Sequence, residues 1–234
     1  AGMITIAPRC RREPDGSLHI ANVIGGLVAD HVLVGCGDAV LLLDCSTAQR
    51  DWIGVHGSLS ADLKWVRGNA EPVEGVTVDE LDAWDGAVLS VLMAGAARRA
   101  GELTLQYCQD RSQFGRSIGK FQVIQHQLSV IVEHIAAMSV AAQMAFAGGQ
   151  RHPGKLAAAV AKARCAEAVQ VVAAAAHGLH GAIGITEEYD LQLLTRCLHE
   201  WRMAHGSELY WNRVVGMAML GREGVKVSDF ARQV

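Results

Sequence analysis

Aromatic residues and prolines are scarce in this chain of 234 residues, and its cysteines follow no recognisable motif. Only 5% of the residues are Phe, Trp or Tyr, and there are 4 prolines beside 25 glycines. This composition excludes a collagen-like or low-complexity chain. The six cysteines are scattered, with no C-x-x-C pair. Scattered cysteines favour reduced thiols, as in the cytoplasm, over a disulfide framework.

Excess charge and long apolar runs are missing as well. The net charge is −3, which argues against nucleic-acid binding through a broad basic surface. The longest uncharged run, residues 168–186, contains a glutamine, two histidines and three glycines, so it is a poor membrane span. No stretch near residue 1 has the basic-then-apolar order of a signal peptide. We therefore expect a cytoplasmic protein that binds no nucleic acid and has no membrane span.

The first third of the chain has the pattern of a small β structure. Short β-type runs alternate with turn signals such as Pro14-Asp15-Gly16. The expected strands cover residues 3–7, 18–23, 31–34, 39–43 and 52–55. The pattern predicts a small antiparallel sheet or barrel over residues 1–80.

The remainder of the chain is rich in alanine, which favours helices. We expect helices over residues 82–109, 120–147, 153–177, 188–202 and 207–220. Long apolar helices joined by short loops predict an antiparallel four-helix bundle over residues 81–234, with extra helices at its end. The fold class is therefore α+β, mainly α. The expected boundary is the acidic segment 71–79, which contains proline and glycine.

A metal site is not expected. The ten histidines form no H-E-x-x-H motif and no set with carboxylates or cysteines at helical spacing.

The most informative stretch lies between the first two expected helices, from Arg111 to Gln122. It reads R-x-x-F-G-x-x-I-x-x-F-Q, with Gln113 and Phe114 inside it. An arginine beside exposed backbone N–H groups can hold a pyrophosphate. On chemistry alone, the favoured interpretation is an ordinary interhelical loop with an exposed arginine.

Together with two later segments, this stretch resembles the C-terminal domain of acyl-CoA dehydrogenases. The segment H-G-A-I-G-I-T-E-E-Y from His180 is similar to the glycine-rich turn of that family, and W-R-M-A-H-G-S-E from Trp201 to its catalytic turn. Residues 16–34 resemble the family's middle β-domain. The matches occur in order over roughly residues 16–220.

The resemblance implies FAD-dependent dehydrogenation of an acyl-CoA thioester between Cα and Cβ, with an electron-transferring flavoprotein as acceptor. It assigns Arg111 to the FAD diphosphate of a neighbouring subunit. The other cofactor contacts that it implies are Gln113 and Phe114 beside the adenosine, Phe121 and Gln122 near the adenine, Gly181 and Ala182 through their backbone, and Ser207 near the catalytic turn.

The catalytic base is the main departure from the family pattern. The common base is a glutamate directly before the glycine of the catalytic turn, and that position holds His205. Other members place a carboxylate at the start of the preceding helix, which corresponds to Asp85. Three alternatives stay open: His205 is the base, Asp85 is the base, or the base lies in a partner chain. His205 could equally be a polar turn residue, and Asp85 a helix-capping one.

The family's N-terminal helical domain has no counterpart in the sequence, and we expect it to be absent. In this respect the chain resembles the short subunits of α2β2 bacterial acyl-CoA dehydrogenases that act on bulky acyl-CoAs, including those of steroid degradation. The expected protein is therefore one subunit of a hetero-oligomer with a second acyl-CoA dehydrogenase-like subunit. The alternative is a non-catalytic partner that only completes the FAD site.

Overall fold

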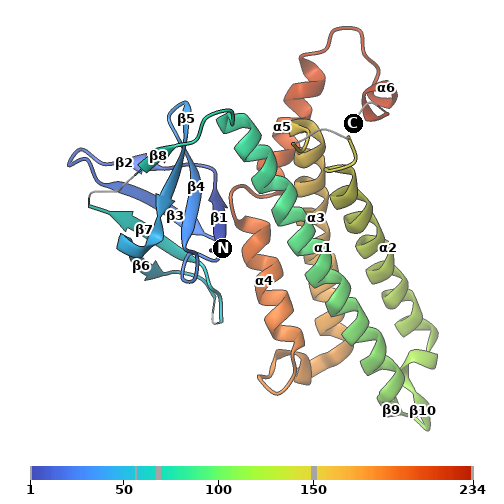
Figure 1. The fold of residues 1–234 in the computed structure, drawn as a ribbon. Coiled ribbons are helices and arrows are strands. Elements are labelled where there is room, and N and C mark those ends of the chain that lie inside the picture. The colour runs from blue at the N-terminus through green and yellow to red at the C-terminus, as the bar shows by residue number, and fades with distance from the viewer. Residues whose placement is uncertain (1, 56, 67–69, 149–151, 233–234) are drawn as a thin grey trace.

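The computed structural model describes residues 2–55, 57–66, 70–148 and 152–232. The strands gather on one side and the long helices stand side by side on the other (Figure 1). The fold is mainly helical, with a small β part, as the sequence predicts.

The β part consists of two four-stranded sheets that face each other. One has the order β1-β4-β5-β8, and the other β2-β3-β7-β6. The first contains β1 (Ile4–Ala7), β4 (His31–Cys36), β5 (Ala39–Asp44) and β8 (Ala70–Pro72), and the second β2 (Arg11–Arg12), β3 (Leu18–Val23), β7 (Ala61–Trp65) and β6 (Gln49–Trp52). A short 3₁₀ turn, η1 (Cys45–Thr47), follows β5.

The prediction of a purely antiparallel sheet is wrong at one place. Strand β1 pairs in parallel with β4, with Ile4 opposite His31. The chain between them crosses to the other sheet and forms β2 and β3, so β4 returns in the direction of β1. Apolar side chains from both sheets, including Ile20, Leu43 and Trp65, are buried between them.

Strand β6 lies earlier in the sequence than predicted, because its residues look polar. It is the edge strand that contains Arg50, rather than residues 52–55. The Arg50 guanidinium donates hydrogen bonds to the carbonyl oxygens of Gly26, Leu27, Ala29 and Cys45. A charged side chain can thus stand in a strand because backbone acceptors from other segments satisfy it.

The five predicted helices are present with shifted ends. They are α1 (Val78–Asp110), α2 (Gln122–Met144), α3 (Lys155–His180), α4 (Leu191–Met203) and α5 (Glu208–Leu220), followed by the short α6 (Val227–Ala231). Helix α1 begins with a capping box, in which Thr77 and Glu80 exchange hydrogen bonds. It starts near the predicted boundary at residue 80, and the division into two domains stays a prediction.

Helix α3 lies at the centre of the bundle. It packs against α1, α2, α4 and α5, and the small side chains of its buried alanines allow these helices to approach closely. By length and composition, residues Lys155–Ile185 would suffice to cross a membrane, although 44% of the most apolar window is buried inside the protein. The packing gives this segment the position of a core helix.

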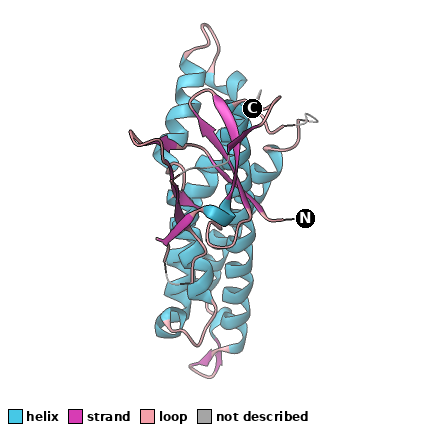
Figure 2. Ribbon diagram, turned by 60° about the vertical axis from the view of Figure 1, so that its left-hand side comes forward, coloured by secondary structure: helices cyan, strands magenta, loops and turns pink. Residues whose placement is uncertain are grey.

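Polar contacts join the β part to the bundle, which it covers along one side (Figure 2). Arg9 forms two hydrogen bonds with Asp82 of α1, at 2.7 and 2.8 Å. The hydroxyl of Ser58 donates to the carboxylate of Glu200 on α4 at 2.6 Å. A third contact joins the turn after α4 to β3, since His205 Nε2 lies 2.9 Å from the carbonyl oxygen of Asn22.

Candidate functional site

A strained hairpin joins α1 to α2 at the end of the bundle. Its strands are β9 (Ser112–Gln113) and β10 (Arg116–Ser117), and the two loop residues, Phe114 and Gly115, have φ angles of 51° and 77°. Two consecutive positive φ angles are typical of a type I′ turn. Glycine adopts this conformation readily, whereas for phenylalanine it costs about 1–2 kcal/mol. Phe114 is nevertheless 90% exposed. The combination of strain and exposure makes this hairpin a candidate ligand site.

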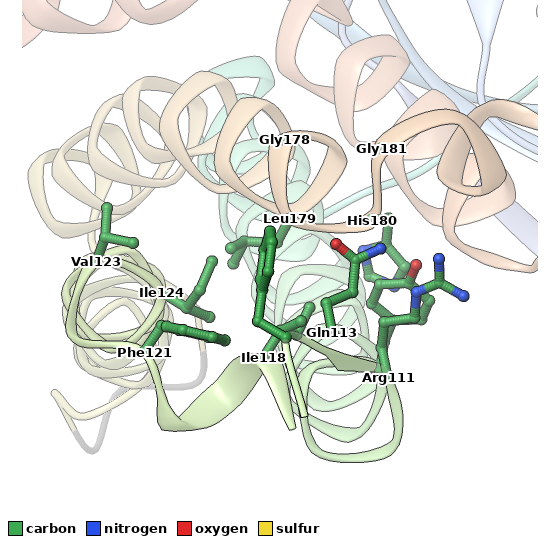
Figure 3. Close-up of a pocket in the computed structure, with 12 residues that line it drawn as sticks. Arg111, Gln113, Ile118, Phe121, Val123, Ile124, Gly178, Leu179, His180 and Gly181 are labelled. Atoms are coloured by element: carbon green, nitrogen blue, oxygen red, sulfur yellow. The ribbon is translucent and has the colours of Figure 1, made fainter. Parts of the chain in front are cut away.

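A pocket of about 440 Å³ opens beside this hairpin, between the end of α1, the start of α2 and the end of α3 (Figure 3). Five of the eight predicted cofactor contacts line it: Arg111, Gln113, Phe114, Phe121 and Gly181. The other lining residues, which sequence reasoning did not identify, are Tyr107, Ile118, Val123, Ile124, Gly178, Leu179 and His180.

The pocket has a polar side and an apolar side. Figure 3 shows Arg111 and Gln113 next to His180, whereas Val123 and Ile124 lie on the opposite side. Gly181 has a φ angle of +64°, and nothing lies within 4 Å of the place where its Cβ would stand. An arginine, an exposed aromatic ring and an open backbone suit a ligand that carries both an anionic group and a planar ring.

His180 adds a buried acceptor to the polar side. Its ring stacks on Tyr107 at a centroid distance of 4.5 Å, and its Nδ1 lies 2.8 Å from the Ala176 carbonyl oxygen. A carbonyl can only accept, so Nδ1 carries the proton. Burial lowers the pKa of His180, which favours the neutral ring and leaves Nε2 as an acceptor. That nitrogen has no hydrogen-bond partner among the described residues.

The remaining predicted contacts lie outside this pocket. Gln122 is the exposed first residue of α2, and Ala182 is exposed in the 3₁₀ segment η3 (Gly181–Ile185) that follows α3. Neither lines the pocket. Ser207 directly precedes α5, and α5 and the hairpin of β9 and β10 lie toward opposite ends of the bundle (Figure 1).

The candidate bases also lie far from the pocket. Asp85 lies on α1 and Arg111 is the residue that caps its end. The two are 26 positions apart, which corresponds to about 39 Å of helical rise. This separation exceeds the length of an extended dinucleotide. The pocket and the candidate bases of one chain therefore cannot serve the same cofactor.

The structure brings the two candidate bases into contact with each other. His205 Nδ1 lies 2.8 and 2.9 Å from the carboxylate oxygens of Asp85, and His205 Nε2 lies 2.9 Å from the carbonyl oxygen of Asn22. Both side chains are buried, with 6% of His205 and 5% of Asp85 exposed. Asp85 does not cap α1, since Thr77 does so two turns earlier.

These contacts fix the protonation of His205. Burial alone would lower the pKa of His205, but the Asp85 carboxylate and the Asn22 carbonyl outweigh burial and raise it. Because both partners accept hydrogen bonds, both ring nitrogens carry protons. An imidazolium has no free lone pair, so His205 cannot take up a proton in this geometry.

The space beside this pair is small. A cavity of about 270 Å³ is bounded by Pro8, Arg9, Asp82, Tyr210 and Trp211 in addition to the pair and Gly206. Its volume lies below the range of typical ligand pockets. Among the described residues, no group of three His, Cys, Asp or Glu side chains could hold a metal ion.

Comparison with known proteins identifies the family. Residues 85–220 match the family described as acyl-CoA dehydrogenase, C-terminal domain. The chain belongs to the acyl-CoA dehydrogenase family. It is 32% identical over 192 residues to acyl-CoA dehydrogenase IpdE2 of Mycolicibacterium smegmatis, and 31% identical over 206 residues to IpdE2 of Mycobacterium tuberculosis. These matches cover 79% and 80% of this chain but only 55% and 58% of the relatives.

Solved acyl-CoA dehydrogenases share the fold. The ChsE4-ChsE5 complex from Mycobacterium tuberculosis matches with a TM-score of 0.75 at 18% identity, covering 95% of this chain and 68% of that chain. The Tcur3481-Tcur3483 steroid ACAD variant matches with a TM-score of 0.77 at 23% identity, over 94% and 63% of the two chains.

The pocket residues of this acyl-CoA dehydrogenase chain fit part of the FAD that the family carries. The exposed Arg111 guanidinium suits a diphosphate, and the Phe114 ring suits an adenine. Tyr107 was detectable from the sequence, since it lies one helical turn before Arg111 and so on the same face.

Proposed function

We propose that this chain is the short subunit of an FAD-dependent acyl-CoA dehydrogenase and that its hairpin pocket forms the adenosine and diphosphate wall of an FAD shared with a second subunit. The observation that carries the proposal is the strained, exposed Phe114 beside Arg111. The pocket lies too far from Asp85 and His205 for one FAD to reach both. The reacting end of an FAD bound in this pocket must therefore lie against another chain, which is why the proposal includes a second subunit.

The residues of the pocket have distinct tasks in this proposal. The Arg111 guanidinium would hold the diphosphate through charge-assisted hydrogen bonds. The Phe114 ring would provide an apolar surface for the adenine, and Gly181 would let the cofactor approach the backbone closely. When bound, FAD supplies the acceptor for the hydride that leaves Cβ of the acyl-CoA.

We further propose that the base that removes the Cα proton belongs to the partner subunit. His205 donates from both ring nitrogens, and Asp85 accepts from His205. The arrangement supports a structural role for this pair, at the junction between the β part and the bundle.

Apolar grooves on the bundle support assembly with the partner. A groove of about 520 Å³ lies between α1 and α2, and one of about 380 Å³ between α2 and α3. Val91 on α1, Val140 and Met144 on α2, and Phe146 just after α2 are each exposed by 42% or more. Apolar surface at this density is typical of a face covered by another subunit.

Two of the similar structures support finer assignments, since one is a steroid ACAD and another a complex of two chains. They favour a bulky, steroid-derived acyl-CoA as substrate and assembly with a second kind of chain. From the resemblance of the sequence to the family we propose in addition an α2β2 assembly, an electron-transferring flavoprotein as acceptor and a cytoplasmic location.

The test is the visible spectrum and mass of the purified chain, alone and co-expressed with an acyl-CoA dehydrogenase-like chain from a neighbouring gene. We expect the chain alone to be colourless, and the complex to be yellow and to bleach with an acyl-CoA. If the chain alone binds flavin and oxidises an acyl-CoA, it contains its own base. If the complex forms without flavin, the assignment of the pocket to FAD is wrong.

A further inference from the structure

Lys162 is a lysine with no exposed surface in the central helix of the bundle. Its relative exposure is 0%, and its neighbours on α3, including Ala158, Ala166 and Cys165, are buried as well. Lysine is almost never fully buried unless its charge is paired or hydrogen-bonded. The side chain therefore requires partners strong enough to replace water.

Those partners are three backbone carbonyl groups around one turn. The Lys162 ammonium donates to the carbonyl oxygens of Trp201 at 3.0 Å, Arg202 at 3.1 Å and Gly206 at 3.1 Å. An ammonium has three donors, so all of them are used. Trp201 and Arg202 belong to the last turn of α4, where carbonyl groups lack helical partners and a positive charge is favourable. Gly206 lies on the far side of His205, so the ammonium bridges the turn.

The turn itself has a backbone that local preferences disfavour. His205 has a φ angle of 52° and Gly206 a φ angle of 110°. A side chain at Gly206 would meet the Tyr210 ring at 2.6 Å, so only glycine fits there. A left-handed histidine persists only when surrounding contacts impose it.

We propose that Lys162 is the positioning residue of this turn: by holding the carbonyl groups on both sides of His205, it keeps the backbone in the conformation that brings the imidazole between Asp85 and Asn22. Asp85 lies on α1, and Asn22 lies at the irregularity of β3. Lys162 thereby acts through His205 on the junction between the β part and the bundle. The inference does not depend on the proposed FAD site.

The pKa of His205 distinguishes a positioning role of Lys162 from an effect of its charge alone, because the two predict shifts of opposite sign when Lys162 is replaced. Burial lowers the pKa of Lys162 to about 8, against the raising influence of Asp85, Cys165 and Glu208, with Arg202 lowering it further. The Lys162 charge lowers the pKa of His205, whereas contact with Asp85 raises it. Removing only the charge would raise the pKa of His205. Releasing the turn would break the contact with Asp85 and lower that pKa.

The experiment compares Lys162→Met with Lys155→Met in the full chain. Lys155 is an exposed lysine on the same helix that pairs with Asp79, so it serves as the matched control. The pKa of His205 is measured by NMR titration of its ring nitrogens. We expect Lys162→Met to lower this pKa, because the contact with the Asp85 carboxylate is lost, and Lys155→Met to leave it unchanged. A raised or unchanged pKa in Lys162→Met would overturn the proposal.

A second measurement decides the matter if Lys162→Met does not fold. In the unmodified chain, Lys162 loses a proton, and with it one donor and its charge, as the pH rises through its pKa. The Cα chemical shifts of His205 and Gly206 report their positive φ angles, and we expect them to move with the same midpoint as Lys162 Nζ. If these shifts show no step at that midpoint, Lys162 does not hold the turn.

Discussion

Replacing Phe114 by Asn should stabilise the chain and weaken FAD binding at the same time. Phe114 has a φ angle of 51°, and asparagine adopts this left-handed conformation far more readily, which removes a cost of about 1–2 kcal/mol. The phenylalanine buries little, since 90% of it is exposed. Its only aromatic contact among the described residues is an edge-on one with Phe121 at 6.1 Å, which is worth about 0.5 kcal/mol at such an exposed place. The free energy of unfolding should therefore rise by about 0.5–1.5 kcal/mol.

The loss in FAD affinity comes from the missing stack. An aromatic ring stacked on a base contributes about 1–3 kcal/mol, so the Kd of FAD for the assembled enzyme should increase by about 5- to 150-fold. Unfolding is followed by urea titration of the isolated chain, and binding by titration of FAD into the flavin-free complex.

Two further variants make the Phe114 experiment specific. Phe114→Tyr keeps both the ring and the strain, so stability and FAD affinity should stay close to wild type. Leu220→Asn replaces an apolar residue of similar exposure, 78%, outside the pocket, and should not change FAD affinity. If Phe114→Asn binds FAD as tightly as wild type, the ring does not contact the cofactor. If that variant is less stable than wild type, the strain argument is wrong.

Three other predictions concern the charged residues. Arg111→Ala should weaken FAD retention by about 1.5–3 kcal/mol, the value of a charge-assisted contact, whereas Arg12→Ala on strand β2 should not; equal flavin content in both after gel filtration would contradict this. His205→Ala should leave turnover of the complex within about tenfold, and a loss near four orders of magnitude would identify His205 as a base after all. The pKa of His205 is raised in the folded state, so the stability it contributes is present below its ordinary pKa near 6.5 and lost as the pH rises through the folded value. Denaturant titrations from pH 6 to 9 should show this loss in wild type and not in His205→Ala, and identical slopes in both would refute it.

The sequence by itself determined the elements whose causes are local. Apolar segments without internal proline produced the five helices α1–α5, because helix propensity and packing favour the same result there. Alanine is abundant in α3 and also contributes to α1 and α2, whereas α4 contains none. The hairpin motif from Arg111 also follows from neighbouring residues, since a two-residue loop ending in Gly115 needs only local chain reversal. Four of the five predicted contacts that line the pocket, Arg111, Gln113, Phe114 and Phe121, belong to this one stretch, whereas Gly181 reaches the pocket only through the packing of α3 against α1 and α2.

The environment of Lys162 is not predictable from the local sequence. It lies four residues after Ala158 and three before Cys165, a helical spacing that places it on the buried face. Residue type alone predicts an exposed lysine. Only the folded chain supplies the three carbonyl acceptors, which come from residues about 40 positions later in the sequence.

The tertiary structure alone decided the roles of Asp85 and His205. The two residues are 120 positions apart, and each by itself looks like a catalytic base, a capping residue or a turn residue. Their contact, together with the Asn22 carbonyl, uses both nitrogens of the imidazole and removes its lone pair. The parallel pairing of β1 with β4 and the position of the strand around Arg50 likewise depend on contacts between distant segments. In each case the partners lie far apart along the chain. A hydrogen bond between them forms only when tertiary packing brings them together, which the neighbouring residues in the sequence do not specify.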